Sequence, residues 1–272
     1  MNYDVIINDV KEVAIEAGNK ILEVYNQPDF DVQLKSDQSP ITKADMIANE
    51  VIVQRLQKNY SDFGILTEES RFDNNRLDKT HVWIIDPLDG TKEFIKRNGE
   101  FTVNIGLVED GEPCFGAVYI PVKQELYYAA RGNGAYFQDS TGAVAKIHCS
   151  PKTKLEQMAL VKSRSHASEK LDRLLQQYQF ASIKERGSSI KICLIAHGLA
   201  EVYFRFGPTN EWDICAAHCV LNEAGGKLTD CPGETLRYNK QDPLNRNGFV
   251  ASNNTIHPNL IEIAKEVMLF GR

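Results

Sequence analysis

The chain carries an unbroken apolar run that gives way at once to two carboxylates. Val82–Ile85 has the composition of a strand buried on both faces, so Asp86 and Asp89 are expected where that strand ends. Open α/β sheets place ligand chemistry at such strand ends. Pro87 fixes φ and has no N–H, so we expect it to stop the strand between the two carboxylates. The segment therefore predicts a sheet edge at which two acidic side chains meet a ligand.

The turn that follows has the features of a metal site that handles phosphate. The carbonyl of Leu88 is expected to face a cation, because the preceding proline keeps it out of a strand ladder. Gly90 permits a close backbone approach. A short helix that opens at Lys92–Phe94 would leave the N–H groups of Gly90 and Thr91 as a seat for an anion. Cation ligands and an anion seat side by side predict phosphate binding.

Two other interpretations of this segment stay open from its residues alone. Asp-Pro and Asp-Gly pairs are ordinary turn formers, so the segment could close a loop that binds nothing. Phosphatases of the haloacid dehalogenase type also place D-x-D-G-[TV] after an apolar strand, with the first aspartate as the nucleophile. Here the spacing is D-x-x-D, which suits two aspartates that share cations better than a nucleophile with its acid–base partner.

Length and composition restrict the class of protein. A chain of 272 residues, 42% hydrophobic and 25% charged, can bury a full core as one large domain or two closely joined lobes. A net charge of −6 with scattered basic residues argues against a nucleic-acid partner. We find no signal peptide and no transmembrane segment, and we expect a cytoplasmic protein whose six cysteines are packing thiols. No apolar stripe marks an interface, so the sequence predicts no particular oligomeric state.

Hydrophobic periodicity changes near residue 150. Before it, two amphipathic helices around residues 6–21 and 44–51 precede strand-like segments. These segments are Phe63–Thr67, Val82–Ile85, Thr102–Val108, Phe115–Ile120, Leu126–Ala129 and Ala135–Gln138. After it, strands and helices alternate. The later elements are a strand at Ala159–Lys162, a helix from Ser168, a helix at Ser189–His197, a strand at Val202–Phe206 and a helix at Asp213–Ala224.

This pattern predicts a mixed α/β (α+β) fold of two stacked lobes in one compact unit. Residues 1–150 are expected to form an N-terminal α+β lobe that carries most of the metal ligands. Residues 151–272 are expected to form a C-terminal α/β lobe that carries Asp213 and the residues of a second anion site.

Further acidic residues stand where a metal site would need them, although each has an ordinary structural explanation. Glu68 and Glu69 follow the strand-like segment that ends at Thr67, and they could equally belong to a solvated loop. Asp213 stands where a helix is expected to begin, which is typical of an N-cap. Asp45 completes the capping-box spacing Thr42-Lys43-Ala44-Asp45.

Together these motifs resemble the inositol monophosphatase superfamily in identity and order. They are Pro40–Asp45, Glu68-Glu69, Trp83–Thr91 and Trp212-Asp213. The resemblance covers nearly the whole chain and implies a layered αβαβα fold of the sugar-phosphatase type. The second half is most similar to the bisphosphate nucleotidases of that superfamily, through Ser163–His166, Gly187–Lys191 and Arg205–Asp213.

The resemblance implies a phosphatase that uses two to three Mg²⁺ ions. Glu68, Asp86 and the Leu88 carbonyl would hold one ion, while Asp86, Asp89 and Asp213 would hold the second. A third, weaker ion would lie beside Glu68. Cations are also required on physical grounds, since two unit charges about 4 Å apart repel by roughly 4 kcal/mol at an effective dielectric constant near 20.

The implied reaction is in-line attack of a metal-activated water on a phosphate monoester, without a phosphoenzyme. Asp45 and Thr91 would orient and deprotonate that water, and Glu68 completes the expected catalytic group. The implied substrate is adenosine 3',5'-bisphosphate, which gives AMP and phosphate, with 3'-phosphoadenylyl sulfate as a second substrate in sulfur assimilation. The alternatives are an inositol or sugar phosphatase with the same metal centre, and a nucleotide- or metal-binding regulator without turnover.

A nucleotide bisphosphate requires a second anion site. Ser189 and Lys191 fit that need at the start of an apolar helix, although a capped helix with a solvated lysine fits the residues equally well. His166 is placed at the same phosphate by the resemblance, and Arg205 could bind phosphate or face solvent. The expected substrate-binding residues are Gly90, Thr91, His166, Ser189, Lys191, Arg205 and Asp213.

Overall fold

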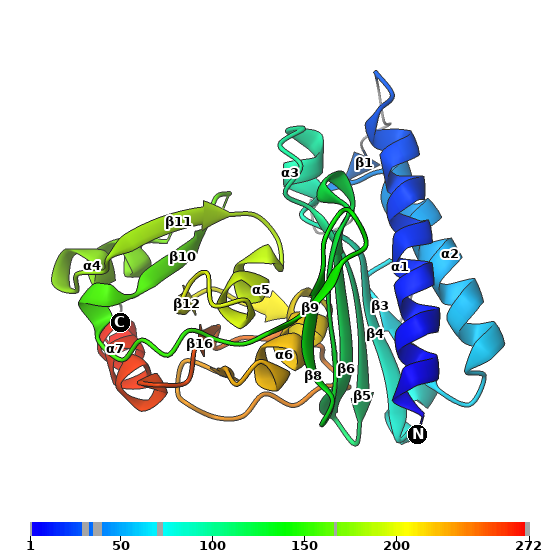
Figure 1. The fold of residues 1–272 in the computed structure, drawn as a ribbon. Helices are drawn as coiled ribbons and strands as arrows, with labels where there is room; N and C mark the ends of the chain where they lie inside the picture. The colour runs from blue at the N-terminus through cyan, green and yellow to red at the C-terminus, as the bar shows by residue number, and fades with distance from the viewer. Residues whose placement is uncertain (1, 29–32, 35–39, 70–72, 166–167, 270–272) are drawn as a thin grey trace.

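The structure is a computed structural model that describes residues 2–28, 33–34, 40–69, 73–165 and 168–269. Over these residues helix pairs and sheets alternate in an αβαβα arrangement (Figure 1). The first helix pair lies on one face of a seven-stranded sheet, and the second pair lies between that sheet and a five-stranded one. A third pair covers the far face of the second sheet. The predicted mixed α/β fold with its layered order is confirmed.

The outer helix pair consists of α1 (Tyr3–Tyr25) and α2 (Lys43–Asn59). Both were predicted from their periodic apolar residues, which are buried against each other and the first sheet. Asn2 caps α1 through its side chain, and Thr42 caps α2 in a capping box with Asp45. The spacing Thr42-Lys43-Ala44-Asp45 thus forms the local structure that it predicted.

The seven-stranded sheet has the order β3-β4-β5-β6-β7-β8-β9 within the described residues. The strands are β3 (Gly64–Thr67), β4 (His81–Asp89), β5 (Thr102–Glu109), β6 (Glu112–Ile120), β7 (Glu125–Ala130), β8 (Gly134–Gln138) and β9 (Val144–Ile147). Strand β3 is parallel to β4, and the other neighbours are antiparallel. On β4, Trp83 and Ile85 face the outer helices while Val82 and Ile84 face the middle layer, so this strand is buried on both sides as predicted.

Pro87 does not end β4, which corrects the prediction from sequence. Strand pairing joins Asp86 to Asn104 and resumes at Asp89 with Thr102, so two residues of β4 stand opposite one residue of β5. This β-bulge accommodates the missing N–H of Pro87, because a bulged residue leaves the hydrogen-bonded ladder. The strand therefore continues through both carboxylates and bends between them.

The middle layer consists of α5 (Ile190–Ala196) and α6 (Glu211–Glu223). Helix α6 begins two residues before the predicted start at Asp213, because Asn210 is its N-cap. The helix lies close against β5 and β6, where Gly106 and Gly116 are direct neighbours in the ladder. A Cβ atom on Gly116 would stand 2.1 Å from the carbonyl oxygen of Ala216, so the glycine permits this approach.

The five-stranded sheet has the order β11-β10-β12-β16-β14 in the part of the chain that the structure describes. Its strands are β10 (Ala159–Ser163), β11 (Ser182–Arg186), β12 (Val202–Arg205), β14 (Lys227–Thr229) and β16 (Phe249–Ser252). Its outer face packs on α4 (Glu169–Gln177) and α7 (His257–Leu269). The short elements are β1 (Gln33–Leu34), β2 (Pro40–Ile41), α3 (Thr91–Ile95), β13 (Thr209–Asn210) and β15 (Leu244–Asn245), with 3₁₀ turns at Asn74–Asp78, Pro121–Lys123 and Leu155–Gln157.

The predicted change of rhythm near residue 150 coincides with the passage from the first sheet to the second. One hydrophobic cluster joins both sheets through the middle helices, so the two sheets share a core. The division of the chain into two lobes at residue 150 stays a prediction. All six cysteines are free thiols, five of them buried, as predicted. No helix among the described residues is long and apolar enough to span a membrane.

We expect Gly116→Ala to lower the free energy of unfolding by about 2 kcal/mol, since the new methyl group meets backbone rather than a flexible side chain. Gly207→Ala is the matched control, because a Cβ there makes only ordinary contacts with the Arg205 side chain, and we expect a change of about 0.5 kcal/mol or less. Urea denaturation measures both. Equal stabilities of the two variants would contradict the proposed close packing of α6.

Candidate active site

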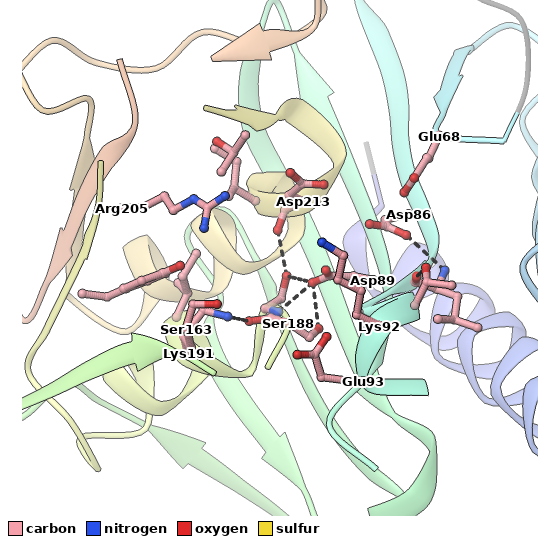
Figure 2. Close-up of a pocket in the computed structure, with 18 of the residues that line it drawn as sticks. Glu68, Asp86, Asp89, Lys92, Glu93, Ser163, Ser188, Lys191, Arg205 and Asp213 are labelled. Atoms are coloured by element: carbon pink, nitrogen blue, oxygen red, sulfur yellow. Dashed lines mark hydrogen bonds between the residues drawn. The ribbon is translucent and has the colours of Figure 1, made fainter. Parts of the chain in front are cut away.

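Chain segments from both sheets meet at a pocket of about 260 Å³. Its walls come from the end of β4, the first turn of α3, and the N-terminal ends of α5 and α6 (Figure 2). Acidic side chains stand on one side of the pocket, while Lys191 and Arg205 come from the opposite side. The pocket therefore presents regions of opposite charge to a ligand.

The structure brings Glu68, Asp86 and Asp213 together, as predicted. One carboxylate oxygen from each lies within 4.8 Å of the others. Glu68 follows β3, and its backbone N–H donates to the Ile85 carbonyl at 3.2 Å, which places it beside Asp86 on the parallel neighbouring strand. Asp86 Oδ1 accepts a hydrogen bond from the Leu88 N–H at 3.1 Å.

Asp213 reaches this group from α6. It occupies the third position of the helix and accepts a hydrogen bond from the Asn210 N–H at 2.8 Å, so it completes a capping box and is not the N-cap. The structural alternative from sequence, in which Asp213 is the N-cap, is wrong: the N-cap is Asn210, three residues earlier. The capping role and a place in the acidic group are compatible, since the capping bond uses only Oδ2.

Burial and mutual repulsion disfavour ionisation in this group. Burial raises the pKa of Asp86 well above its ordinary value, and the neighbouring charges of Glu68, Asp89 and Asp213 raise it further. Burial, then Asp89 and Glu68, raises the pKa of Asp213 to about 8. Such carboxyl groups become fully ionised near neutral pH only when a cation compensates them.

Asp89 lies in the same pocket but is held separately. Its Oδ2 atom accepts hydrogen bonds from Ser188 Oγ at 2.7 Å, from the Ser189 N–H at 2.7 Å and from Asn104 Nδ2 at 3.3 Å, and Ser189 Oγ lies 3.0 Å away. Thr102 hydrogen-bonds both Asn104 and Ser188. One oxygen of Asp89 is thereby surrounded by donors from β5 and from the turn before α5.

Asp45 and Thr91, the predicted water-activating pair, also lie together. Asp45 is 1% exposed, and its Oδ2 accepts hydrogen bonds from the N–H and hydroxyl of Thr42 at 2.7 and 2.6 Å. Its Oδ1 lies 3.4 Å from Thr91 Oγ1, which is also 3.4 Å from the Leu88 carbonyl oxygen. The hydroxyl therefore stands between a fixed carboxylate and the backbone of the bulge.

The predicted helical turn forms as α3 with Gly90 as its N-cap. Gly90 has a φ of 93°, and a side chain there would meet the backbone of Glu100 and Phe101. Glu93, which also lines the pocket, accepts a hydrogen bond from Ser165, just after β10, and this ties α3 to the second sheet. The N-terminal N–H groups of α3 are thus presented beside the acidic group, in the position proposed for an anion.

Three of the four residues predicted for a second anion site, Ser189, Lys191 and Arg205, lie in the described part of the chain. Lys191 is 6% exposed, donates to the Ser188 carbonyl at 2.6 Å and has a pKa lowered to about 8 by burial. Arg205 lines the same pocket and donates to the Pro208 carbonyl at 3.3 Å. Ser189 is buried, and its hydroxyl lies among Asp89, Asn104 and the Asp213 carbonyl. His166 lies outside the described residues.

Several site residues were not predicted from the sequence. Asn104 stands in the apolar run of β5, and a buried amide within such a run is a usable signal that was not used. Ser188 lies within the predicted motif Gly187–Lys191 but was given no role of its own, and its φ of 55°, which few residues other than glycine adopt, was not predicted. Lys92 lines the pocket directly after Thr91, although it was predicted only as the start of a short helix.

The donor set has a definite chemical preference. Carboxylates and a backbone carbonyl are hard oxygen ligands, which Mg²⁺ and related divalent cations favour over zinc. The raised pKa values of Asp86 and Asp213 indicate that such a cation would relieve an unfavourable arrangement. Donor types and electrostatics therefore fit a divalent metal centre beside an anion-binding surface.

Comparison with known proteins agrees with this chemistry. The CysQ 3'(2'),5'-bisphosphate nucleotidases of Escherichia coli K12 and Salmonella typhimurium are 40% and 39% identical over 249 and 246 residues, covering 91% and 90% of this chain and 99% and 98% of the relatives. The crystal structure of CysQ from Bacteroides thetaiotaomicron, a bacterial member of the inositol monophosphatase family, superimposes with a TM-score of 0.78 at 40% identity, covering 90% of this chain and 95% of that chain. An inositol monophosphatase from Anabaena, 25% identical, also gives 0.78, with 98% and 97% covered.

The match to a family is equally extensive. The model of the Inositol monophosphatase family covers residues 2–269. With solved relatives that share the layered fold, this extent shows that the chain belongs to the inositol monophosphatase family.

Proposed function

We propose that this protein is a Mg²⁺-dependent 3'(2'),5'-bisphosphate nucleotidase that hydrolyses the 3'-phosphate of adenosine 3',5'-bisphosphate to AMP and phosphate. The observation that carries the proposal is one pocket with buried and half-buried carboxylates on one side and the cations Lys191 and Arg205 on the other. The names of the bacterial CysQ relatives support the choice of substrate. 3'-Phosphoadenylyl sulfate would be a second substrate.

The acidic residues would hold two to three Mg²⁺ ions. Glu68, Asp86 and the Leu88 carbonyl are proposed ligands of one ion, and Asp86, Asp89 and Asp213 of the second, with a weaker third beside Glu68. When bound, the ions would supply charge to the phosphate oxygens and lower the pKa of a bound water.

The chain's own residues would move the proton. Thr91 Oγ1, 3.4 Å from Asp45 Oδ1, is proposed to accept a hydrogen bond from the attacking water while donating to that carboxylate. Asp45 can serve as the acceptor because Thr42 already holds its other oxygen in place. Glu68, which lies beside Asp86 at the end of the neighbouring strand β3, is proposed to complete the catalytic group.

The rest of the pocket would bind the substrate's phosphates. The N–H groups of Gly90 and Thr91 are proposed to face the reacting phosphate, close to Asp213. Lys191 and Arg205 would bind the 5'-phosphate on the opposite wall, with Ser189 and His166 as further proposed contacts. A monophosphate of inositol or of a sugar has no second phosphate that could bind Lys191 and Arg205.

A substrate panel tests the function. With Mg²⁺, we expect phosphate release from adenosine 3',5'-bisphosphate with a kcat/KM at least about tenfold above that for inositol monophosphate, because only the bisphosphate uses the second site. EDTA should abolish release. A preference for inositol monophosphate would support the alternative sugar-phosphatase function, and absence of turnover on every substrate would reject catalysis.

Asp45→Asn tests the water-activating pair. We expect kcat to fall by about 10²- to 10⁴-fold, since the proton acceptor is lost while the proposed ligands remain. The amide oxygen can still accept from Thr42, so the fold should persist. Mg²⁺ and nucleotide affinities, measured by calorimetry, should stay at the wild-type level. The exposed change Asp73→Asn is the control, and an unchanged kcat in Asp45→Asn would refute the assignment.

The raised pKa of Asp213 predicts a pH-dependent stability. Without metal, the folded chain holds a proton at this carboxyl that the unfolded chain releases near its ordinary pKa of 3.8. That stabilising contribution is complete below the ordinary pKa of 3.8 and is lost as the pH rises to about 8, so the melting temperature in EDTA should fall between about pH 4 and about pH 8 and level off above that. Saturating Mg²⁺ should reduce the fall, and so should Asp213→Asn in EDTA. Identical pH profiles for wild type and variant would contradict this.

A further inference from the structure

The amino group of Lys92 forms no polar contact with the described part of the chain. Lys92 is exposed on the first turn of α3, and it lines the active-site pocket. Figure 2 shows its amino group directed toward the space between Asp89 and Asp213. Among the residues that the structure describes, its amino group makes no hydrogen bond or ion pair. An exposed lysine of this kind is free to reach a ligand.

The other basic residues of the pocket are already engaged. Lys191 donates to the Ser188 carbonyl, and Arg205 donates to the Pro208 carbonyl. Both come from the second sheet or the helix beside it. Lys92 instead belongs to the same helical turn as Thr91 and follows the bulge that carries Asp86 and Asp89. It therefore faces the acidic side of the pocket rather than the wall proposed for the 5'-phosphate.

The charge balance of the proposed metal centre leaves a negative charge on a bound phosphate that Lys92 could neutralise. The carboxylates of Glu68, Asp86, Asp89 and Asp213 would together be neutralised by two divalent cations, which leaves no net charge at the proposed metal centre. A phosphate monoester adds two negative charges near neutral pH. A lysine ammonium is a compact point charge on a flexible stem, so Lys92 can follow a phosphate as it changes from ester to free ion.

We propose that Lys92 binds the non-bridging oxygens of the reacting phosphate and of the inorganic phosphate released from it. This inference rests on the proposed phosphatase function and deepens it by assigning a substrate-binding residue. Lys191 serves the substrate's other phosphate, so the two lysines divide a bisphosphate between them. The assignment predicts that Lys92 affects every substrate alike, whereas Lys191 affects only those with a second phosphate.

The test compares Lys92→Gln with Lys96→Gln. Lys96 is the matched control because it is an exposed lysine at the other end of the same short helix, contacts Ser165 and does not line the pocket. With Mg²⁺ present, calorimetry measures the dissociation constant of inorganic phosphate. Steady-state assays measure KM for adenosine 3',5'-bisphosphate and for adenosine 3'-monophosphate.

We expect Lys92→Gln to weaken phosphate binding by about tenfold or more and to raise both KM values by similar factors, in line with loss of one charge-assisted hydrogen bond. Lys92→Arg should restore most of the affinity, and Lys96→Gln should match wild type. Lys191→Ala should raise KM for the bisphosphate alone.

Wild-type phosphate affinity and KM values in Lys92→Gln would overturn the assignment, and so would an equal loss in Lys96→Gln. Absence of turnover in the wild type would instead refute the proposed function. The binding measurement on inorganic phosphate does not depend on turnover, so the two failures are distinguishable.

Discussion

Carboxylates that are gathered away from water repel one another, and the active-site pocket is organised around that repulsion. Asp86 is 2% exposed, and the charges of Glu68, Asp89 and Asp213 all act to raise its pKa. Each carboxylate is nevertheless held in place by backbone donors or by the strand that carries it. A folded chain that maintains this arrangement has an increased affinity for cations, because a bound cation relieves the repulsion while the carboxylates stay in place.

The arrangement depends on parts of the chain that are far apart. The bulge at Pro87 bends β4 between two ligands, and β3 carries Glu68 to the same edge because it runs parallel to β4. Asp213 arrives on α6, which can approach the first sheet only because glycines 106 and 116 leave room for its backbone. Ligand geometry is therefore a property of the assembled layers, and a packing change at the glycine pair would reach the site through α6.

The sequence predicted those features that local pattern controls. The apolar run before Asp86 identified a strand buried on both faces, and the capping box at Asp45 formed as its spacing indicated. The prediction that Pro87 ends the strand was wrong, since a missing N–H is compatible with a bulge as well as with a strand end.

Features that arise only when distant segments meet were beyond local pattern. Asn104 and Ser188 surround Asp89 from a strand and a turn that are separated by more than one helix and sheet in the chain. The direction of Lys92 into the pocket likewise depends on where α3 is anchored by Glu93 and Ser165. The roles assigned to individual site residues remain predictions for experiment.

The crowding of donors at one end of Asp89 limits how that carboxylate can meet an ion. In the described part of the chain, hydrogen bonds reach only its Oδ2 atom. An ion at this place would thus take a single oxygen in a fixed direction. Mg²⁺ accepts such one-oxygen contacts within a strict octahedron, whereas Ca²⁺ commonly grips both oxygens of a carboxylate. Asn104, Ser188 and Ser189, none of which is a proposed metal ligand, would in this way favour Mg²⁺ over Ca²⁺ at the site.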